Sequence, residues 1–408
     1  MIHSAALKWK KMSLEKFQRF PNRALTHCVM IAASVCGVQN ASANVLTLEA
    51  GFAKESITPN INDPKNPIWI AGFGQKRQAR SVNDPLWSRV MALRHGERQG
   101  VMVALDAIGF MHNDILDIRD AVQKELKLDF VIISSTHDHE APDLIGIWGP
   151  SLFKTGINPR YMALVKSQTV KAIRAAVTSL EPVAVQRMEL PNVGADVVVD
   201  TRNPQVFDSN VRLLRFVRLS DNQTAGTFIT WANHPEVLWN ANTAITSDYV
   251  HFLRDGIENG IRYGEQTLKQ GLGGTAVYVN GAVGGLMTTL DSTPVVDAVL
   301  NQTLTTPSFE KARGVGYRVA EAVLDGIAAG REQPVQGDAF QWTSKSLLLP
   351  VDNIKFRAAA LLKVIPRKFE SGFKTRSEAG LLQLGDTWIG TIPGELYPEI
   401  ANGGIETP

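Results

Sequence analysis

Residues 130–142 read FVIISSTHDHEAP, an apolar run that leads directly into two histidines. The run Phe130–Ser134 is short, rich in β-branched residues and followed by polar ones, a pattern that predicts a buried β-strand. His137 and His139 come next in an extended segment, where alternate side chains point to the same side. The pair can therefore offer a metal ion two imidazoles, or one imidazole and a close neighbour.

Similar apolar runs alternate with helical patterns along the chain. The expected strands are Val101–Leu105, Phe130–Ser134, Gly226–Trp231, Thr275–Val279, Leu381–Leu384 and Thr387–Ile392, and the expected helices are Asp114–Leu126, Pro159–Leu180 and Ser308–Ala329. Strands alternating with helices favour an α/β domain. Because the spacing is irregular, we expect mixed β-sheet layers flanked by helices, with residues 44–408 forming one domain.

The first 43 residues predict a signal peptide. A basic stretch ends at Arg23, an apolar run covers residues 24–38, and Ala41-Ser42-Ala43 forms a cleavage motif. A buried helix is the alternative, since the apolar run is too short to span a membrane. Cleavage after about Ala43 would leave an exported protein, periplasmic or secreted. Both cysteines lie in this segment, so the mature chain would have neither disulfides nor thiolate metal ligands.

Composition narrows the range of partners. The chain has 408 residues, of which 44% are hydrophobic and 20% charged, as in a soluble globular protein. Without the basic N-terminal segment the chain is slightly acidic, whereas nucleic-acid binding needs a basic surface. We therefore expect no nucleic-acid partner. No later run reaches the roughly 18 apolar residues of a membrane helix, and the sequence sets no oligomeric state.

Two more polar groups follow predicted strands as the histidine pair does. His234 comes after Gly226–Trp231, and Glu395 comes after Thr387–Ile392. Such groups converge at one rim of an α/β sheet, where ligands bind. Catalytic zinc usually takes three imidazole or carboxylate ligands from the protein, plus water. We therefore predict a Zn²⁺ site at the C-terminal ends of the strands.

Each group also has a plainer interpretation. A His-x-His pair can be a surface turn, and His234 before Pro235 can be hydrogen-bonded in a turn. Glu395 can be a charge at a helix N-terminus, favoured by the helix dipole. The arrangement at three strand ends is what favours the metal site.

Several motifs together resemble a known family. They are Thr136-His137-Asp138-His139-Glu140-Ala141-Pro142, Asn233-His234-Pro235, Thr246-Ser247-Asp248 and Ile392-Pro393-Gly394-Glu395. In this order, over nearly all of residues 44–400, they resemble the N-terminal catalytic domain of neutral/alkaline non-lysosomal ceramidases. Their counterparts in that family are T-H-T-H-S-G-P, V-H-P, S-G-D and P-G-E.

The resemblance implies roles for the strand-end residues. His137, His234 and Glu395 would be zinc ligands, and His139 would be a catalytic group that helps hold the water or the tetrahedral intermediate. The implied reaction is attack of a zinc-activated water on the amide carbonyl of an N-acyl, ceramide-like lipid. Peripheral membrane contact would give access to such a substrate.

The resemblance also implies supporting residues. Asp138, Asp248 and Asp106 are candidates for orienting the imidazoles by hydrogen bonds. Arg202, in Asp200-Thr201-Arg202-Asn203-Pro204, resembles an arginine region that lines the family's substrate pocket. A surface salt bridge is the alternative role for Arg202.

Two departures from the family concern the substrate and the metal. The family carries N-x-D-V-S-P-N, whose serine is needed for activity, whereas residues 280–286 here read NGAVGGL. Gly284 therefore stands at a substrate-binding position without a hydroxyl group. The family's fourth ligand, a tyrosine, and its C-terminal immunoglobulin-like domain would lie beyond Pro408, so we expect a chain that lacks these parts.

These departures leave three functions open. The first is a zinc-dependent amidohydrolase, and the second is a non-catalytic binding protein that kept the ceramidase scaffold. The third is a metal-dependent esterase, because the same water attacks esters more easily than amides.

Overall fold

The computed structural model describes residues 45–403, except residues 286, 298 and 368. The predicted signal peptide, residues 1–43, lies outside the described residues and remains a prediction. Among the described helices, none has the length and apolar character needed to cross a membrane.

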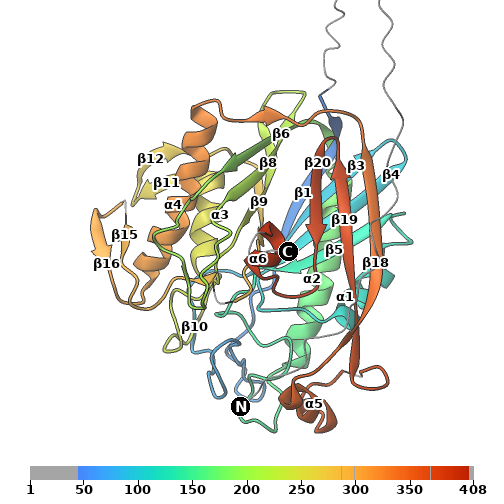
Figure 1. Ribbon diagram of the computed structural model, residues 1–408, viewed down its shortest axis with the longest axis vertical. Helices are drawn as coiled ribbons and strands as arrows, with labels where there is room; N and C mark the ends of the chain where they lie inside the picture. The colour runs from blue at the N-terminus through green and yellow to red at the C-terminus, as the bar shows by residue number, and fades with distance from the viewer. Residues whose placement is uncertain (1–44, 286, 298, 368, 404–408) are drawn as a thin grey trace, which may run out of the picture. The chain divides into compact units, whose positions relative to one another are not determined.

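The predicted strand at residues 130–134 is an edge strand of a nine-stranded sheet (Figure 1). β5 (Phe130–Ser135) pairs in parallel with β4 (Arg98–Leu105), and at the other edge β13 (Thr275–Asn280) pairs in parallel with β9 (Thr224–Trp231). The antiparallel strands between them are β3 (Trp87–His95), β1 (Thr47–Ser56), β6 (Glu181–Leu190) and β8 (Val211–Arg218), with the short β17 (Gln333–Pro334) beside β6. The sheet is therefore mixed, as the sequence predicts.

The two edges of this sheet approach each other because the sheet twists. β5 and β9 are six pairing steps apart, and a twist of roughly 20–25° per step adds up to more than about 120°. β13 consequently contacts β3, β4 and β5 across the fold. This brings the C-terminal ends of β5 and β9 to one place, although by pairing alone the two strands run in opposite directions.

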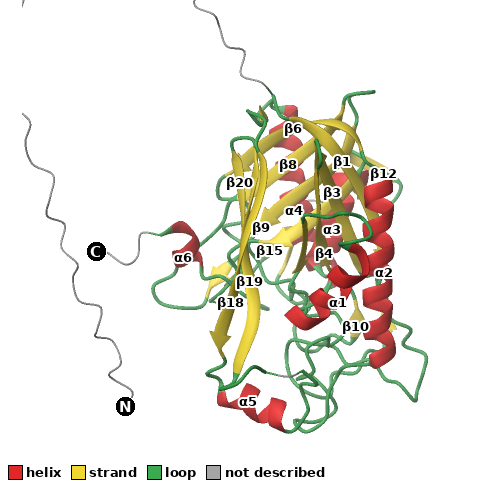
Figure 2. Ribbon diagram, turned by 90° about the vertical axis from the view of Figure 1, so that its right-hand side faces the viewer, coloured by secondary structure: helices red, strands yellow, loops and turns green. Residues whose placement is uncertain are grey.

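Helices cover the outer faces of both halves of the sheet (Figure 2). α1 (His112–Val122) contacts α2 (Pro159–Thr178), which packs on β1, β3 and β4. α3 (Tyr249–Asn259) and α4 (Phe309–Ala328) pack against each other and contact β13, β6 and β8. The fold thus has helices outside and sheet inside on both halves.

The side-chain alternation of the strands produces this layering. On β4, Val101 and Val103 belong to the core under α1 and α2, whereas Met102 and Ala104 belong to a third core that both halves of the sheet share. Phe340 and Leu382 join that inner core from a separate three-stranded sheet. Because successive strand residues point to opposite faces, each long strand contributes to two cores.

The separate sheet carries the segment with Glu395. It consists of β18 (Phe340–Pro350), β19 (Lys374–Leu384) and β20 (Thr387–Thr391), with α5 (Ile354–Leu361) between the first two strands. The β19–β20 hairpin confirms the two strands predicted at residues 381–392. Glu395 follows β20 and precedes α6 (Pro398–Asn402).

The remaining strands are short pairs: β2 (Ser81–Val82) with β10 (Ala244–Ile245), β7 (Val199–Asp200) with β14 (Met287–Thr288), β11 (Gly260–Tyr263) with β12 (Gln266–Gln270), and β15 (Val295–Asp297) with β16 (Gln302–Leu304).

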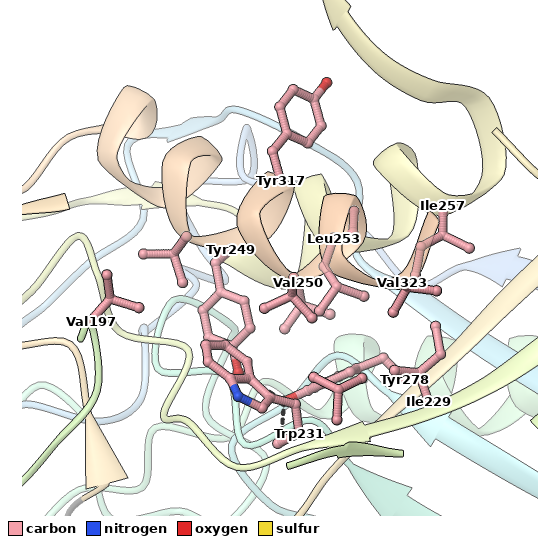
Figure 3. Packing of buried hydrophobic residues seen from close by; sticks show 14 of the residues in the cluster. Val197, Ile229, Trp231, Tyr249, Val250, Leu253, Ile257, Tyr278, Tyr317 and Val323 are labelled. Atoms are coloured by element: carbon pink, nitrogen blue, oxygen red, sulfur yellow. Dashed lines mark hydrogen bonds between the residues drawn. The ribbon is translucent and has the colours of Figure 1, made fainter. Parts of the chain in front are cut away.

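The core under α3 and α4 holds the end of β9 in place. Figure 3 shows Trp231, Tyr249 and Tyr278 within this core. The hydroxyl of Tyr249 donates to the carbonyl of Asn233 at 2.7 Å, and that of Tyr278 donates to the carbonyl of Trp231 at 2.7 Å. Both bonds fix backbone immediately before His234, so the packing of this core determines where that imidazole lies.

Candidate metal centre

Three imidazoles from two strand ends lie together. The candidate ligand atoms of His137, His139 and His234 are all within 4.8 Å of one another. His137 and His139 follow β5, and His234 follows β9. The ring centroids of His137 and His234 are 4.7 Å apart, although 97 positions separate them in the chain. The structure thus brings together the three histidines that the sequence singled out.

Asn280 joins the two loops that carry these histidines. It lies at the end of β13, and its amide nitrogen donates to the carbonyls of Thr136 at 3.0 Å and Asn233 at 2.9 Å. The backbone nitrogen of His139 also donates to the carbonyl of Pro235 at 3.0 Å. The two loops are therefore held as one unit before any ligand binds.

The hydrogen bonds of two imidazoles fix their tautomers. Nδ1 of His137 lies 2.7 Å from the carbonyl of Ile108, and Nδ1 of His234 lies 2.8 Å from the carbonyl of Met287. Because a carbonyl oxygen only accepts hydrogen bonds, each Nδ1 carries a hydrogen, and each Nε2 presents a lone pair when its ring is uncharged. Burial lowers the pKa of His234, but contact with Glu395 and the charge of Glu236 raise it above the usual value. Burial and the two neighbouring imidazoles lower the pKa of His137 to about 4. His137 is therefore uncharged at neutral pH, as a metal ligand must be.

Glu395 places a carboxylate against these lone pairs. Its Oε1 lies 3.3 Å from Nε2 of His137, and its Oε2 lies 3.6 Å from Nε2 of His234. Contact with His234 lowers the pKa of Glu395 to about 2, so the carboxylate is ionised. Its side chain is 47% exposed, whereas that of His234 is 3% exposed. The cluster therefore opens to solvent on the side of Glu395.

The spacing of these atoms fits a metal ion. Two ligands about 2.0–2.1 Å from one zinc ion, at the tetrahedral angle, lie about 3.3–3.4 Å apart. The separations from Glu395 to His137 and His234 are 3.3 and 3.6 Å. Lone pairs and a carboxylate at such distances repel one another unless a proton or a metal cation lies between them. Neutral imidazoles with a carboxylate are also the donor set that zinc prefers.

The three aspartates predicted to orient the imidazoles contact other groups. Asp106 accepts two bonds from Arg254 at 2.7 and 2.8 Å, and Asp248 accepts from the backbone of Tyr249 at the start of α3. Asp138 accepts from the backbone nitrogen of Glu140 at 2.9 Å. In the described part of the chain, the imidazole Nδ1 atoms instead face two carbonyls and Glu236. A role of these aspartates in orienting the imidazoles therefore stays a prediction, and the described contacts of the ring Nδ1 atoms come from loop backbone and Glu236.

Arg202 and Gly284, both predicted at the substrate, lie against the segment that carries Glu395. The guanidinium of Arg202 bonds Asp200 at 3.0 Å and Glu399 at 2.8 Å, and it lies over the ring of Tyr397 at 4.7 Å. The backbone nitrogen of Gly284 donates to the carbonyl of Leu396 at 2.8 Å. Both residues therefore fix residues 395–399, and direct contact with a substrate stays a prediction for each.

Restoring a serine at position 284 is expected to damage the site. A Cβ atom there would lie 2.8 Å from the carbonyl oxygens of Glu395 and Leu396. Gly284→Ser should therefore lower the free energy of unfolding by about 1–3 kcal/mol and weaken zinc binding, because Glu395 must move. Gly390→Ser is the matched control, since no heavy atom lies within 4 Å of its added Cβ. Denaturant unfolding and zinc titration measure both effects; unchanged stability of Gly284→Ser would contradict the account.

Glu236 is the site residue that the sequence reasoning missed. Its Oε2 lies 2.9 Å from Nδ1 of His139, and its Oε1 accepts from the hydroxyl of Thr288 at 2.6 Å. The available signal was its position, two residues after His234 in a strand-end loop. A carboxylate that stands so close to one candidate ligand, here His234, can accept from the ring of another metal-binding histidine, here His139.

Comparison with known proteins supports the fold. No model of a known protein family matches the sequence, and no curated protein matches it. The solved structures that match include the neutral ceramidase from Pseudomonas aeruginosa and a ceramidase complexed with C2. Each gives a TM-score of 0.63 at 14% identity over 86% of this chain. The chain has a ceramidase-like fold. It spans 63% and 64% of the length of the two ceramidase chains, and at this identity the likeness is one of fold alone.

Proposed function

We propose that this protein is a zinc-dependent hydrolase that cleaves the amide bond of an N-acyl, ceramide-like lipid. The observation that carries the proposal is the convergence of three imidazoles, whose candidate ligand atoms lie within 4.8 Å of one another, with the carboxylate of Glu395, which lies 3.3 and 3.6 Å from two of them. The ceramidase-like fold supports the substrate class, because the matched structures are ceramidases. A zinc ion bound there would supply an activated water and would polarise the substrate carbonyl.

Each residue of the cluster would have its own role toward the bound ion. His137 and His234 would hold the ion through Nε2, and their bonds to backbone carbonyls keep those atoms aimed at it. Glu395 would complete the binding from the exposed side, where a substrate carbonyl can approach. His139 lies beside that position, where its Nε2 can bind the water, the tetrahedral intermediate or the ion itself.

Hydrolysis of short-chain N-acyl amides and of matched esters tests the proposal. We expect amide hydrolysis that a chelator abolishes and added zinc restores. Hydrolysis of the ester alone would support the metal-dependent esterase instead. Bound zinc without turnover of either compound would support the non-catalytic binding protein, for which Gly284 is the motivating residue.

The remaining features are proposed with this function. Residues 44–408 would be a single ceramidase-like catalytic domain of an exported protein, and peripheral membrane contact would deliver the lipid. Mass spectrometry of the mature protein should find an N-terminus near Asn44. An N-terminus at Met1 in the exported fraction would contradict the proposed signal peptide.

A further inference from the structure

His139 and Glu236 form a buried contact at the edge of the histidine cluster. Oε2 of Glu236 lies 2.9 Å from Nδ1 of His139, and the two side chains are only 8% and 12% exposed. Thr288 donates to the other carboxylate oxygen at 2.6 Å, which fixes the rotation of the carboxylate. The carboxylate therefore has one defined orientation toward the imidazole.

This contact selects the tautomer of His139. A carboxylate offers only lone pairs, so the 2.9 Å contact with Glu236 favours the tautomer of His139 that carries its hydrogen on Nδ1, although the two atoms are not aligned as a hydrogen bond. Nε2 of His139 then carries a lone pair, and this atom lies 3.3 Å from Nε2 of His137. Because Nδ1 of His137 bonds the carbonyl of Ile108, Nε2 of the uncharged His137 carries a lone pair as well. Two facing lone pairs cannot form a hydrogen bond, but they can share one cation.

The ring of His139 is also fixed by apolar packing. Phe73 meets it edge-on with ring centroids 5.3 Å apart. The backbone of Gly72 lies so close that an added Cβ atom would come within 2.8 Å of the imidazole. The ring therefore has little room to turn Nε2 away from His137.

The distance between the two Nε2 atoms is the one that a shared ion requires. Ligands of one tetrahedral zinc ion lie about 3.3–3.4 Å apart, and the two Nε2 atoms are 3.3 Å apart. His139 thus lies where a further ligand of the same ion would lie. It does so with a partner, Glu236, that stands two residues after His234 in this sequence.

We propose that Glu236 is a positioning residue that makes His139 a direct, third imidazole ligand of the metal. The centre then consists of three histidines and one glutamate from this chain: His137, His139, His234 and Glu395. This inference rests on the proposed zinc site and gives it a different ligand set. With four ligands from the protein, water or substrate would take a fifth position on the exposed side, by Glu395.

Zinc X-ray absorption of the reloaded full chain counts the bound imidazoles. We expect three in the unchanged protein and two in His139→Ala. For Glu236→Gln we expect zinc affinity to fall about 10- to 100-fold, the usual effect of losing a partner of a ligating histidine. Glu332→Gln is the matched control, because Glu332 is similarly buried but pairs with Arg215. Its zinc affinity should equal that of the unchanged protein.

Three results would overturn the inference. Two imidazoles in the unchanged protein would show that His139 only neighbours the ion, and the proposed zinc site would survive. Unaltered zinc affinity in Glu236→Gln, with normal thermal unfolding, would remove the positioning role. A chain that binds no zinc would overturn both this inference and the proposed function.

Discussion

Replacing His137 with alanine is expected to lower zinc affinity by more than about 100-fold, beyond the loss seen for indirect partners. His137 contacts every other member of the cluster: its Nε2 lies 3.3 Å from both His139 and Glu395, and its ring packs 4.7 Å from that of His234. Without it the ion keeps no ligand on that side. Amide hydrolysis should fall with zinc occupancy.

Isothermal titration with zinc and a chelator-controlled activity assay measure the two losses in the His137→Ala variant. His95→Ala is the control, because His95 ends β3 and lies outside the cluster. It should keep both zinc binding and activity. Full zinc affinity in His137→Ala would place the metal elsewhere in the protein.

The second large effect is expected from Asp106→Asn. Asp106 and Arg254 are 0% and 1% exposed and are joined by two bonds of 2.7 and 2.8 Å. Removing one charge leaves the other buried without compensation, which costs about 3–5 kcal/mol of unfolding free energy. Zinc affinity should change little, because Asp106 bonds Arg254 rather than an imidazole.

Denaturant unfolding and zinc titration of the Asp106→Asn variant separate these roles. The backbone nitrogen of Trp87 donates to Asp106 at 2.8 Å, and asparagine keeps an oxygen that can accept this bond. The loss of unfolding free energy therefore reports mainly on the ion pair. Asp106→Leu combined with Arg254→Met should recover part of the stability, because apolar replacement of a buried pair is often tolerated. A large loss of zinc affinity with unchanged stability would instead favour the orienting role that the sequence suggested.

Local patterns explain what the sequence could predict. The strand Phe130–Ser135 and the histidines after it lie in one short stretch, and the start of α4 is marked by Ser308, whose side chain accepts from the backbone of Lys311. α3 was not predicted. Its buried face includes Arg254 and Glu258, which are charged and paired inside the fold, so the apolar periodicity is interrupted.

Contacts between distant segments explain what the sequence could not predict. Asn280 reaches Thr136 across 144 positions, and Arg254 reaches Asp106 across 148. No local pattern marks such pairs. The same holds for Glu236, which faces His139 only because the sheet twist brings the ends of β5 and β9 together. Gly284, which the sequence predicts at the substrate, also approaches the backbone of Glu395 and Leu396, a contact that no local pattern marks.

Zinc content of the purified full chain tests the central claim most directly. After removal of metal and reloading, the account predicts about one zinc ion per chain, bound tightly enough to survive gel filtration. The double variant His137→Ala/His234→Ala should retain almost none. Less than about 0.2 zinc per chain in the unchanged protein, with no binding in a titration, would contradict a zinc centre at these residues.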